Sequence, residues 1–291
     1  MPATALLPGP GTAPGDAPFV DSARHPAIRR VSDVIRSRSA TPRTLLLDDA
    51  HSIERAIHAG VGVEAIYATV KHADEAQRLH EGAPLADRVI VSKDVMRSLL
   101  PRDNAPRMLA LARAPRAARW GDISAAAGDV LVLDGVRITG NIGAIVRSAC
   151  ALGAAGVVLL DSGLRSAYDR RLVRASRGLV FELPTVLAEP HDLVSFLHAE
   201  GMPLAGLSAD ADAPLEHIRR HAGRIAILIG SERFGASDAL DAVTAARYAV
   251  PMATGVESLN VSVAAALALY ERSGARRCAG SATARRRAAG A

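Results

Sequence analysis

The sequence predicts an α/β protein of two domains, with a mostly parallel sheet in the second domain. The length of 291 residues fits two domains of ordinary size. Hydrophobic residues make up 49% of the chain and aromatic residues only 3%, so the core must consist mainly of Ala, Val, Leu and Ile. Short apolar runs alternate with helical patterns, and in the second half these runs are continuous, which is typical of parallel strands covered on both faces.

Composition divides the chain into five segments. We expect a disordered leader rich in Pro, Gly and Ala, a small α/β domain, a linker, a larger α/β domain and a basic disordered tail. Their bounds are 1–18, 19–112, 113–124, 125–273 and 274–291. The linker holds Trp120, the only tryptophan, which either anchors the linker to a domain surface or stacks on a base.

The first domain is expected to alternate strands and helices. Runs rich in Leu, Val and Ile indicate the strands, and Gly60 and Pro101 end helical patterns. The expected strands span 43–47, 63–69, 88–91 and 108–112, and the expected helices span 49–59, 74–80 and 93–100.

The second domain repeats this alternation more regularly. The expected strands span 129–134, 156–160, 183–187, 203–207, 224–229 and 248–252, and the expected helices span 142–152, 168–177, 191–200, 214–221, 236–245 and 259–272. Ligands of parallel sheets bind beyond the carboxyl ends of the strands, so the loops at those ends are the candidate sites. These loops follow Asp134, Leu207, Ile229 and Met252.

Charge and cysteine content limit the class of protein. The formal net charge is +5, and Lys71 and Lys93 are the only lysines among 35 basic residues. A GC-rich genome explains most of this arginine excess, so only clustered arginines inform on function. Cys150 and Cys278 are too few for a disulfide framework or a zinc site, and no apolar run reaches the roughly 18 residues of a membrane span. Without a secretory signal at the N-terminus, these features predict a soluble cytoplasmic protein with no metal and no membrane partner.

The first candidate loop, DGVRITGNIGAIVRSAC, has three glycines around a strand-to-helix passage. Glycine there lets the backbone approach a ligand, but the spacing matches neither a dinucleotide fingerprint nor a phosphate-binding loop. Asn141 either caps the following helix or contacts a ligand. Arg147 lies in an apolar segment, so it either faces a partner or a solvent-filled cavity, or it is an ordinary exposed helix residue.

Two further candidate loops follow apolar strands. In ILIGSERFG, Gly230 permits close backbone contact with a flat ligand, and Glu232 is placed to bind a ligand hydroxyl, to orient a substrate or to cap the next helix. In VPMATGVESLNVSVAAALALYE, we expect Ser258 to cap a long helix and Asn260 to offer its amide to a ligand. That helix is apolar on nearly every side, which predicts that it is buried or lies at a subunit interface.

Arginines cluster in RSAYDRRLVRASRG, which has five arginines and a single acidic residue. If this segment is helical, Arg170, Arg174 and Arg177 share one face. Together with Arg165 they form a positive stripe that suits a phosphate backbone. The alternative interpretation is an ordinary solvated helix face.

Taken together, the three loops resemble the three motifs of the SPOUT superfamily of methyltransferases. The motifs are NIGAIVR, IGSERFG and VPM…ESLNVSVAAALALYE, and they occur in the family's order over about residues 120–273. Within the superfamily the chain is most similar to the ribose 2′-O-methyltransferases, and among these to the thiostrepton- and nosiheptide-resistance 23S rRNA methyltransferases of actinomycetes. The segments ARAPRAARWGDI and DRRLVRASRGLVFELPTVL carry the likeness to that subfamily.

The resemblance implies a fold, a cofactor and site residues that the patterns alone do not show. The second domain would contain a deep trefoil knot that holds S-adenosylmethionine, the active unit would be a homodimer, and the first domain would be a ribosomal-protein-like RNA-recognition domain. By motif match, the catalytic residues would be Arg147, Asn141, Glu232, Ser258 and Asn260. The cofactor would contact Arg147, Arg177, Leu207, Gly230, Val250, Met252 and Leu259, and RNA would contact Arg165, Arg170, Arg174 and Arg177.

The resemblance also implies the reaction. The protein would methylate the ribose 2′-hydroxyl of an adenosine in 23S rRNA, and this methylation would confer resistance to thiopeptide antibiotics. Arg147 would orient the hydroxyl and stabilise the developing negative charge, because a guanidinium stays protonated and makes a poor base. A tRNA ribose 2′-O-methyltransferase and a catalytically inactive RNA-binding protein of the same fold remain as alternatives. A nicotinamide oxidoreductase is disfavoured, because the dinucleotide fingerprint is missing.

Overall fold

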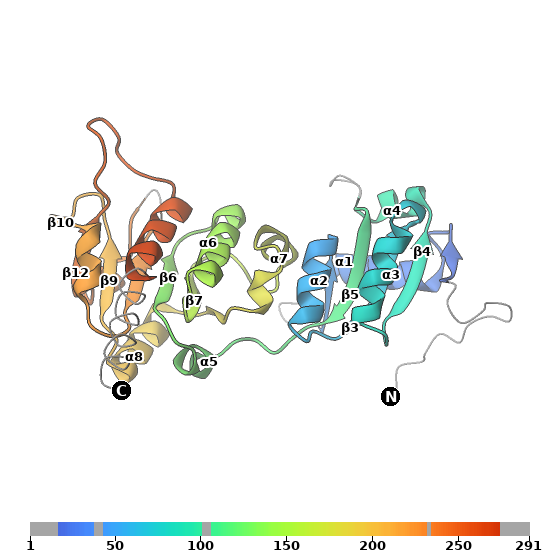
Figure 1. Ribbon diagram of the computed structural model, residues 1–291, viewed down its shortest axis with the longest axis horizontal. Helices are drawn as coiled ribbons and strands as arrows, with labels where there is room; N and C mark the ends of the chain where they lie inside the picture. The colour runs from blue at the N-terminus through green and yellow to red at the C-terminus, as the bar shows by residue number, and fades with distance from the viewer. Residues whose placement is uncertain (1–16, 38–42, 101–105, 232–233, 274–291) are drawn as a thin grey trace, which may run out of the picture. The chain divides into compact units, whose positions relative to one another are not determined.

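The computed structural model describes residues 17–37, 43–100, 106–231 and 234–273. The chain forms two compact units, Met1–Pro115 and Arg116–Ala291, each with its own sheet (Figure 1). The expected leader apart from its last two residues, the expected tail and Glu232 lie outside the described residues. Within the described ranges no helix is long and apolar enough to cross a membrane.

The described residues of the N-terminal unit form a mixed five-stranded sheet in the order β1-β4-β3-β5-β2 (Figure 1, blue to green). Strands β1, β4 and β3 run parallel, whereas β5 pairs antiparallel with both β3 and β2. The elements are β1 (Phe19–Val20), α1 (Pro26–Arg36), β2 (Thr44–Leu47), α2 (Ala50–His58), β3 (Val63–Thr69), η1 (Val70–His72), α3 (Ala73–Gly82), β4 (Asp87–Val91), α4 (Lys93–Leu99) and β5 (Met108–Arg113). The strands and helices expected after residue 43 are confirmed, and β1, α1 and η1 add to them.

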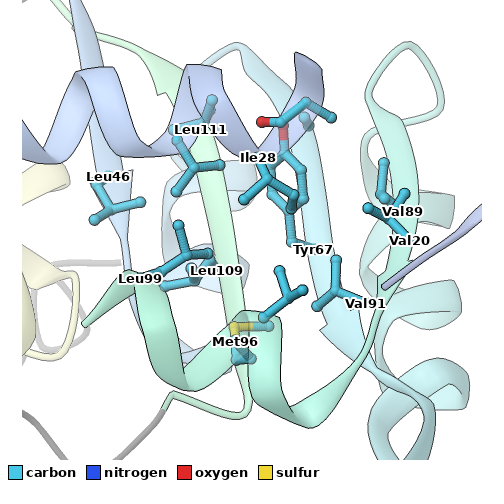
Figure 2. Close-up of a cluster of buried hydrophobic side chains, with 14 of the residues drawn as sticks. Val20, Ile28, Leu46, Tyr67, Val89, Val91, Met96, Leu99, Leu109 and Leu111 are labelled. Carbon is cyan, nitrogen blue, oxygen red and sulfur yellow. The ribbon is translucent and has the colours of Figure 1, made fainter. Parts of the chain in front are cut away.

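The core of the N-terminal unit includes side chains of α1 and α4 packed on the sheet (Figure 2). Pro26 opens α1, a position at which its missing N–H costs no helical hydrogen bond. Ile28 of α1 and Met96 of α4 pack around Tyr67 of β3. Burial raises the pKa of Tyr67 to about 12, and its hydroxyl donates a hydrogen bond to the carbonyl oxygen of Ala27 at 3.4 Å. The N-terminal unit therefore has its own apolar core.

The C-terminal unit is built on a seven-stranded parallel sheet of described residues, in the order β10-β12-β9-β11-β6-β7-β8 (Figure 1, green to red). The elements are α5 (Trp120–Ala125), β6 (Val130–Asp134), α6 (Thr139–Ala151), β7 (Gly156–Leu160), α7 (Arg170–Ala175), η2 (Leu179–Phe181), β8 (Thr185–Leu187), α8 (Pro190–Glu200), β9 (Leu204–Leu207), β10 (Ala213–Pro214), η3 (Leu215–Arg220), β11 (Ala226–Ile229), α9 (Asp238–Asp241), β12 (Ala246–Ala249) and a last helix over residues 261–273. The expected α/β class with a parallel sheet is confirmed.

The central strands of this sheet are covered on both faces. Val130 and Val132 of β6 pack in one apolar cluster with Leu193 of α8. Leu131 and Leu133 alternate with them along the strand, so they point to the opposite face, and they are fully buried too. This double burial explains why the strand sequences are continuous apolar runs.

Several expected boundaries differ from the observed ones. The expected linker ends in α5, whose Trp120 stacks on Phe196 of α8 with ring centroids 4.6 Å apart, so this tryptophan anchors the segment to the C-terminal unit. The helix expected at 236–245 is reduced to the short α9, and β12 begins two residues earlier than expected. Pro251 lacks an N–H for the ladder, so the chain leaves the sheet before it.

A buried ion pair ties the last helix to the start of β6. Arg272 is 3% exposed and Asp129 is 1% exposed, and two hydrogen bonds of 2.9 and 3.1 Å join the guanidinium to the carboxylate. The same guanidinium donates to the carbonyl oxygens of Ile218, His221 and Gly223. Since charges are rarely buried without full hydrogen bonding, this cluster fixes the C-terminal segment to the middle of the sheet.

Candidate functional site

The carboxyl ends of β9, β11 and β12 open onto one cavity of about 550 Å³. Most of its walls come from loops that directly follow these strands, as the rule for parallel sheets predicts. The predicted cofactor residues among its lining are Leu207, Gly230, Val250, Met252 and Leu259. The structure therefore brings together residues that are up to 52 positions apart in the sequence.

The loop after β11 turns back tightly on itself through a pair of glycines. Ser231 and Gly235 form an antiparallel bridge, with N–H to carbonyl distances of 2.8 and 3.0 Å. A Cβ atom on Gly230 would lie only 2.1 Å from the carbonyl carbon of Gly235, and Gly235 itself has a φ of +68°. Both positions therefore require glycine, Gly230 for space and Gly235 for its left-handed backbone.

Two asparagines join the first turn of α6 to the loop after β12. The side-chain amide of Asn260 donates to the side-chain oxygen of Asn141 at 3.3 Å. Asn260 also caps the last helix, because its side-chain oxygen accepts from the N–H of Ser262 at 2.9 Å. The expected cap, Ser258, instead lies in the preceding loop and lines the cavity. Asn141 is the third residue of α6, so its interpretation as a helix cap is wrong.

Arg147 and Arg177 lie apart from this cavity. Arg147 is exposed on α6, and neither arginine belongs to the described residues that line the cavity. Arg177 follows the end of α7 with a φ of +52°. Within one chain, the predicted cofactor contacts of these two arginines are therefore not assembled.

The arginine-rich segment differs from the expected helical stripe. The helix α7 spans only Arg170–Ala175, so Arg177 does not continue the face of Arg170 and Arg174. Asp169 pairs with Arg171 at 3.1 Å. Arg165, Arg170 and Arg174 also have interaction partners within the chain. Arg165 and Arg174 are nonetheless exposed, and Arg170 is partly so.

A tyrosine–histidine pair supports the wall of the cavity. Tyr248 lines the cavity, and its hydroxyl lies 2.7 Å from Nε2 of His221. Burial raises the pKa of Tyr248, whereas burial and the nearby Arg272 lower the pKa of His221. The neutral forms of both side chains are therefore favoured, which suits a single neutral hydrogen bond between them.

A second cavity of about 500 Å³ adjoins the first at the carboxyl ends of β6 and β7. Arg137, Asn141 and Asp161 line it. Four residues after β11 belong to the linings of both cavities, namely Ser231, Phe234, Gly235 and Ala236. Sequence reasoning missed Arg137, Asp161 and Phe234, although Asp161 directly follows a buried strand, which was the available signal. Among the described residues no cluster of His, Cys, Asp or Glu is arranged to hold a metal ion.

A parallel sheet with two adjoining cavities at its carboxyl edge is typical of an α/β domain with a small-molecule site. The sequence profile of the SpoU rRNA Methylase family matches residues 129–270, and that of the thiostrepton-resistance methylase N terminus matches residues 17–126. The chain therefore belongs to the SpoU rRNA methylase family, and its N-terminal part matches that of the thiostrepton-resistance methylases.

Individual relatives cover both units. A 23S rRNA (adenosine(1067)-2′-O)-methyltransferase of Streptomyces azureus is 39% identical over 251 residues, which cover 85% of this chain and 92% of the relative. A crystal structure of an RNA 2′-O ribose methyltransferase superposes with a TM-score of 0.73 at 29% identity, covering 89% of this chain and 99% of the other. The SpoU methyltransferase AviRb from Streptomyces viridochromogenes, in complex with the cofactor AdoMet, shares the fold with a TM-score of 0.73 at 24% identity, covering 87% of this chain and 98% of the other.

Proposed function

We propose that this protein transfers a methyl group from S-adenosylmethionine to a ribose 2′-hydroxyl of 23S rRNA in the cytoplasm, with an adenosine as the target, and thereby gives resistance to thiopeptide antibiotics. The observation that carries the proposal is the arrangement of the three loops at one edge of the sheet. The loops after β11 and β12 line the first cavity, the loop after β6 lines the adjoining second cavity, and the hydrogen bond from Asn260 to Asn141 ties the loop after β12 to α6. The activity named for the Streptomyces azureus relative, a 23S rRNA (adenosine(1067)-2′-O)-methyltransferase, supports the choice of RNA and of nucleoside.

The first cavity fits a cofactor with a flat adenine and a flexible polar end. Gly230 leaves the backbone bare, so its N–H and C=O groups and those of the neighbouring loops can bind the edge of a base. Leu207, Met252 and Leu259 supply apolar walls. Bound there, S-adenosylmethionine supplies a methyl group activated by a positively charged sulfur.

The residues around the cavity act mainly by positioning. S-adenosylmethionine would supply the methyl carbon and the sulfur leaving group for an in-line displacement by the ribose oxygen, and Gly230, Met252 and Leu259 would hold this donor in place. The hydroxyl proton passes to water or to an RNA phosphate oxygen. Arg147 orients the hydroxyl and stabilises the negative charge that develops on its oxygen, because its guanidinium keeps its proton.

The active unit in this proposal is a homodimer. On the last helix, Val263, Leu267 and Tyr270 are exposed at spacings of four and three residues, so they form an apolar stripe on one face. Burial of such a stripe against a second copy removes it from water. Arg147 does not line the cavity of its own chain, which supports a site completed across the dimer.

A trefoil knot is also part of the proposal. Two strands, β9 and β11, lie between β12 and β6 in the sheet. The segment after β12 nevertheless returns to β6, since Asn260 bonds Asn141 beyond the end of that strand and Arg272 pairs with Asp129 at its start. A return of this kind, past the loop that follows β11, supports a knotted path.

The proposed RNA path begins on the N-terminal unit, which acts as the RNA-recognition domain. The match to the thiostrepton-resistance methylase N terminus supports this role. Helix α1 presents Arg29 and Arg36 to solvent, and Arg165 and Arg174 are exposed on the C-terminal unit. Arginines of this kind bind phosphate oxygens through paired N–H donors.

The test is transfer of a radioactive methyl group from S-adenosylmethionine to purified rRNA and tRNA, followed by mapping of the methylated nucleotide. Label at one adenosine ribose of 23S rRNA is expected. Label in tRNA instead would favour a tRNA methyltransferase, and cofactor binding without any transfer would favour an inactive RNA-binding protein.

Arg147→Ala tests the role of the arginine. Its turnover is expected to fall roughly 10²–10³-fold, as when one charge-stabilising donor is removed, with the Kd for the cofactor kept. Arg219→Ala is the matched control, because Arg219 is an exposed arginine that pairs with Glu271. Near-normal turnover of Arg147→Ala would contradict the assigned role.

A further inference from the structure

The second cavity shares a wall with the cofactor cavity but has a different character. Its floor is formed by the ends of β6 and β7, and Asn141 lines it. Asn260, the hydrogen-bond partner of Asn141, belongs to the loop whose Ser258 and Leu259 line the first cavity. The asparagine pair therefore stands between the two cavities.

Phe234 is the most unusual side chain of the shared wall. It lines both cavities and is 85% exposed, although this chain has only 4 phenylalanines and buries most of its large apolar side chains. Its backbone is held, since its N–H donates to the hydroxyl of Ser231 at 3.1 Å. An aromatic ring presented to solvent on a fixed backbone is a platform on which a flat ligand can stack.

A charged pair forms another part of the second cavity. Arg137 holds the carboxylate of Asp161 through hydrogen bonds of 2.8 and 2.6 Å, and both side chains are about two-thirds exposed. Asp161 has a φ of +44°, a strained backbone for a residue other than glycine. The pair bridges the loops after β6 and β7, and its outer N–H and carboxylate oxygens face solvent. Such groups suit the hydrogen-bonding edge of a base.

We propose that the second cavity binds the nucleobase of the nucleoside that is methylated, with Phe234 stacking on the base and the Arg137–Asp161 pair facing its edge. This inference rests on the proposed methyl transfer. The acceptor oxygen must approach the methyl group in line, so the acceptor must occupy a space that adjoins the cofactor. With the base on Phe234, the ribose lies beside Asn141, between the two cavities.

A second copy of the chain is the competing occupant of this surface. The cores of protein interfaces are depleted in charged residues, whereas this cavity has an exposed arginine and aspartate on its wall. A nucleobase can stack on the ring of Phe234 and form hydrogen bonds with Arg137 and Asp161, so a nucleobase fits this cavity better than a second copy of the chain does.

The experiment is a cycle of two changes, one in the protein and one in the RNA. The substrate is a 23S rRNA fragment with the methylated nucleotide, and its variant lacks the base at that nucleotide but keeps the ribose 2′-hydroxyl. Phe234→Leu is expected to lower kcat/KM for the intact fragment roughly 5- to 150-fold, the effect of losing one base–aromatic stack. The same variant is expected to act on the abasic fragment as the unchanged protein does, because the stack is already absent there.

Two further variants, the Kd for S-adenosylmethionine and the oligomeric state separate the outcomes. Phe234→Tyr keeps the ring and should restore kcat/KM, and Val243→Ala removes an exposed apolar side chain elsewhere and should leave it unchanged. Equal losses on intact and abasic RNA, a loss confined to the Kd for S-adenosylmethionine, or conversion of Phe234→Leu to a monomer would each overturn the inference. If the unchanged protein binds the cofactor and methylates no RNA, it is the proposed function that fails.

Discussion

Removal of the buried guanidinium of Arg272 tests how the C-terminal segment is held. Arg272→Met keeps an unbranched apolar stem but deletes five hydrogen bonds, two to Asp129 and three to backbone carbonyl oxygens. The Asp129 carboxylate then stays buried without its charge partner, although the N–H of Ile225 still donates to it at 3.0 Å. Loss of one partner of a buried ion pair costs about 3–5 kcal/mol of unfolding free energy.

The assay is denaturant unfolding of the full chain followed by tryptophan fluorescence. Trp120 is the only tryptophan and stacks on Phe196, so it reports on the C-terminal unit alone. Arg219→Met is the matched control. Arg219 pairs with Glu271 at the surface, and an exposed pair contributes at most about 1 kcal/mol.

A second variant distinguishes loss of the charge pair from loss of packing. Asp129→Leu combined with Arg272→Met removes both charges, so it should recover part of the stability lost in the single variant. If Arg272→Met loses no more stability than Arg219→Met, the buried pair does not anchor the last helix, and our reasoning on this cluster is refuted.

Three other changes test the steric fit of two glycines and the protonation of His221. Gly230→Ala places a Cβ atom 2.1 Å from the backbone of Gly235, so calorimetry should show loss of cofactor binding, with a stability loss of about 1–3 kcal/mol. Gly140→Ala has nothing within 4 Å of the new atom, so it should leave stability unchanged or slightly raised; a similar effect of both changes would contradict the steric argument. The pKa of His221 is lowered in the folded protein, so below its ordinary value of 6.5 the unfolded chain binds this proton more readily, and stability falls as the pH falls. His221→Asn should therefore show a smaller decrease in Tm between pH 7 and about pH 5, and an unchanged decrease would exclude His221 as a contributor.

The elements that could be predicted are those whose sequence pattern reflects their own burial. Strands such as β7 are continuous apolar runs because both of their faces are covered, and β7 was expected with its observed bounds. The position of the first cavity, which we propose holds the cofactor, was predictable for a related reason. Gly230 and Met252 lie where parallel strands end, and parallel strands end at one edge of the sheet.

The elements that could not be predicted depend on partners distant in the chain. Ser258 and Asn260 are both good helix caps, and only the fold shows that Asn260 caps the last helix while it bonds Asn141. The arginine stripe was misjudged because Arg177 takes a left-handed backbone after α7, which a helical projection does not reveal. Local pattern reports on burial, whereas polar side chains are placed by tertiary contacts.

The two cavities should also differ in how they tolerate change, because different residues line them outside the wall that they share. The first cavity combines bare backbone at Gly230 with apolar side chains such as Leu207, Met252 and Leu259, so changes that add volume at Gly230 or polarity at these side chains are expected to be harmful. The second cavity presents the side chains of Phe234, Arg137 and Asp161, so a change of chemistry at equal volume is enough to alter what it binds. A methyl donor is the same for every RNA substrate, whereas the target nucleoside differs. If the second cavity holds the acceptor as proposed, changes at Arg137 or Asp161, which do not line the first cavity, can therefore alter the target without rebuilding the cofactor site.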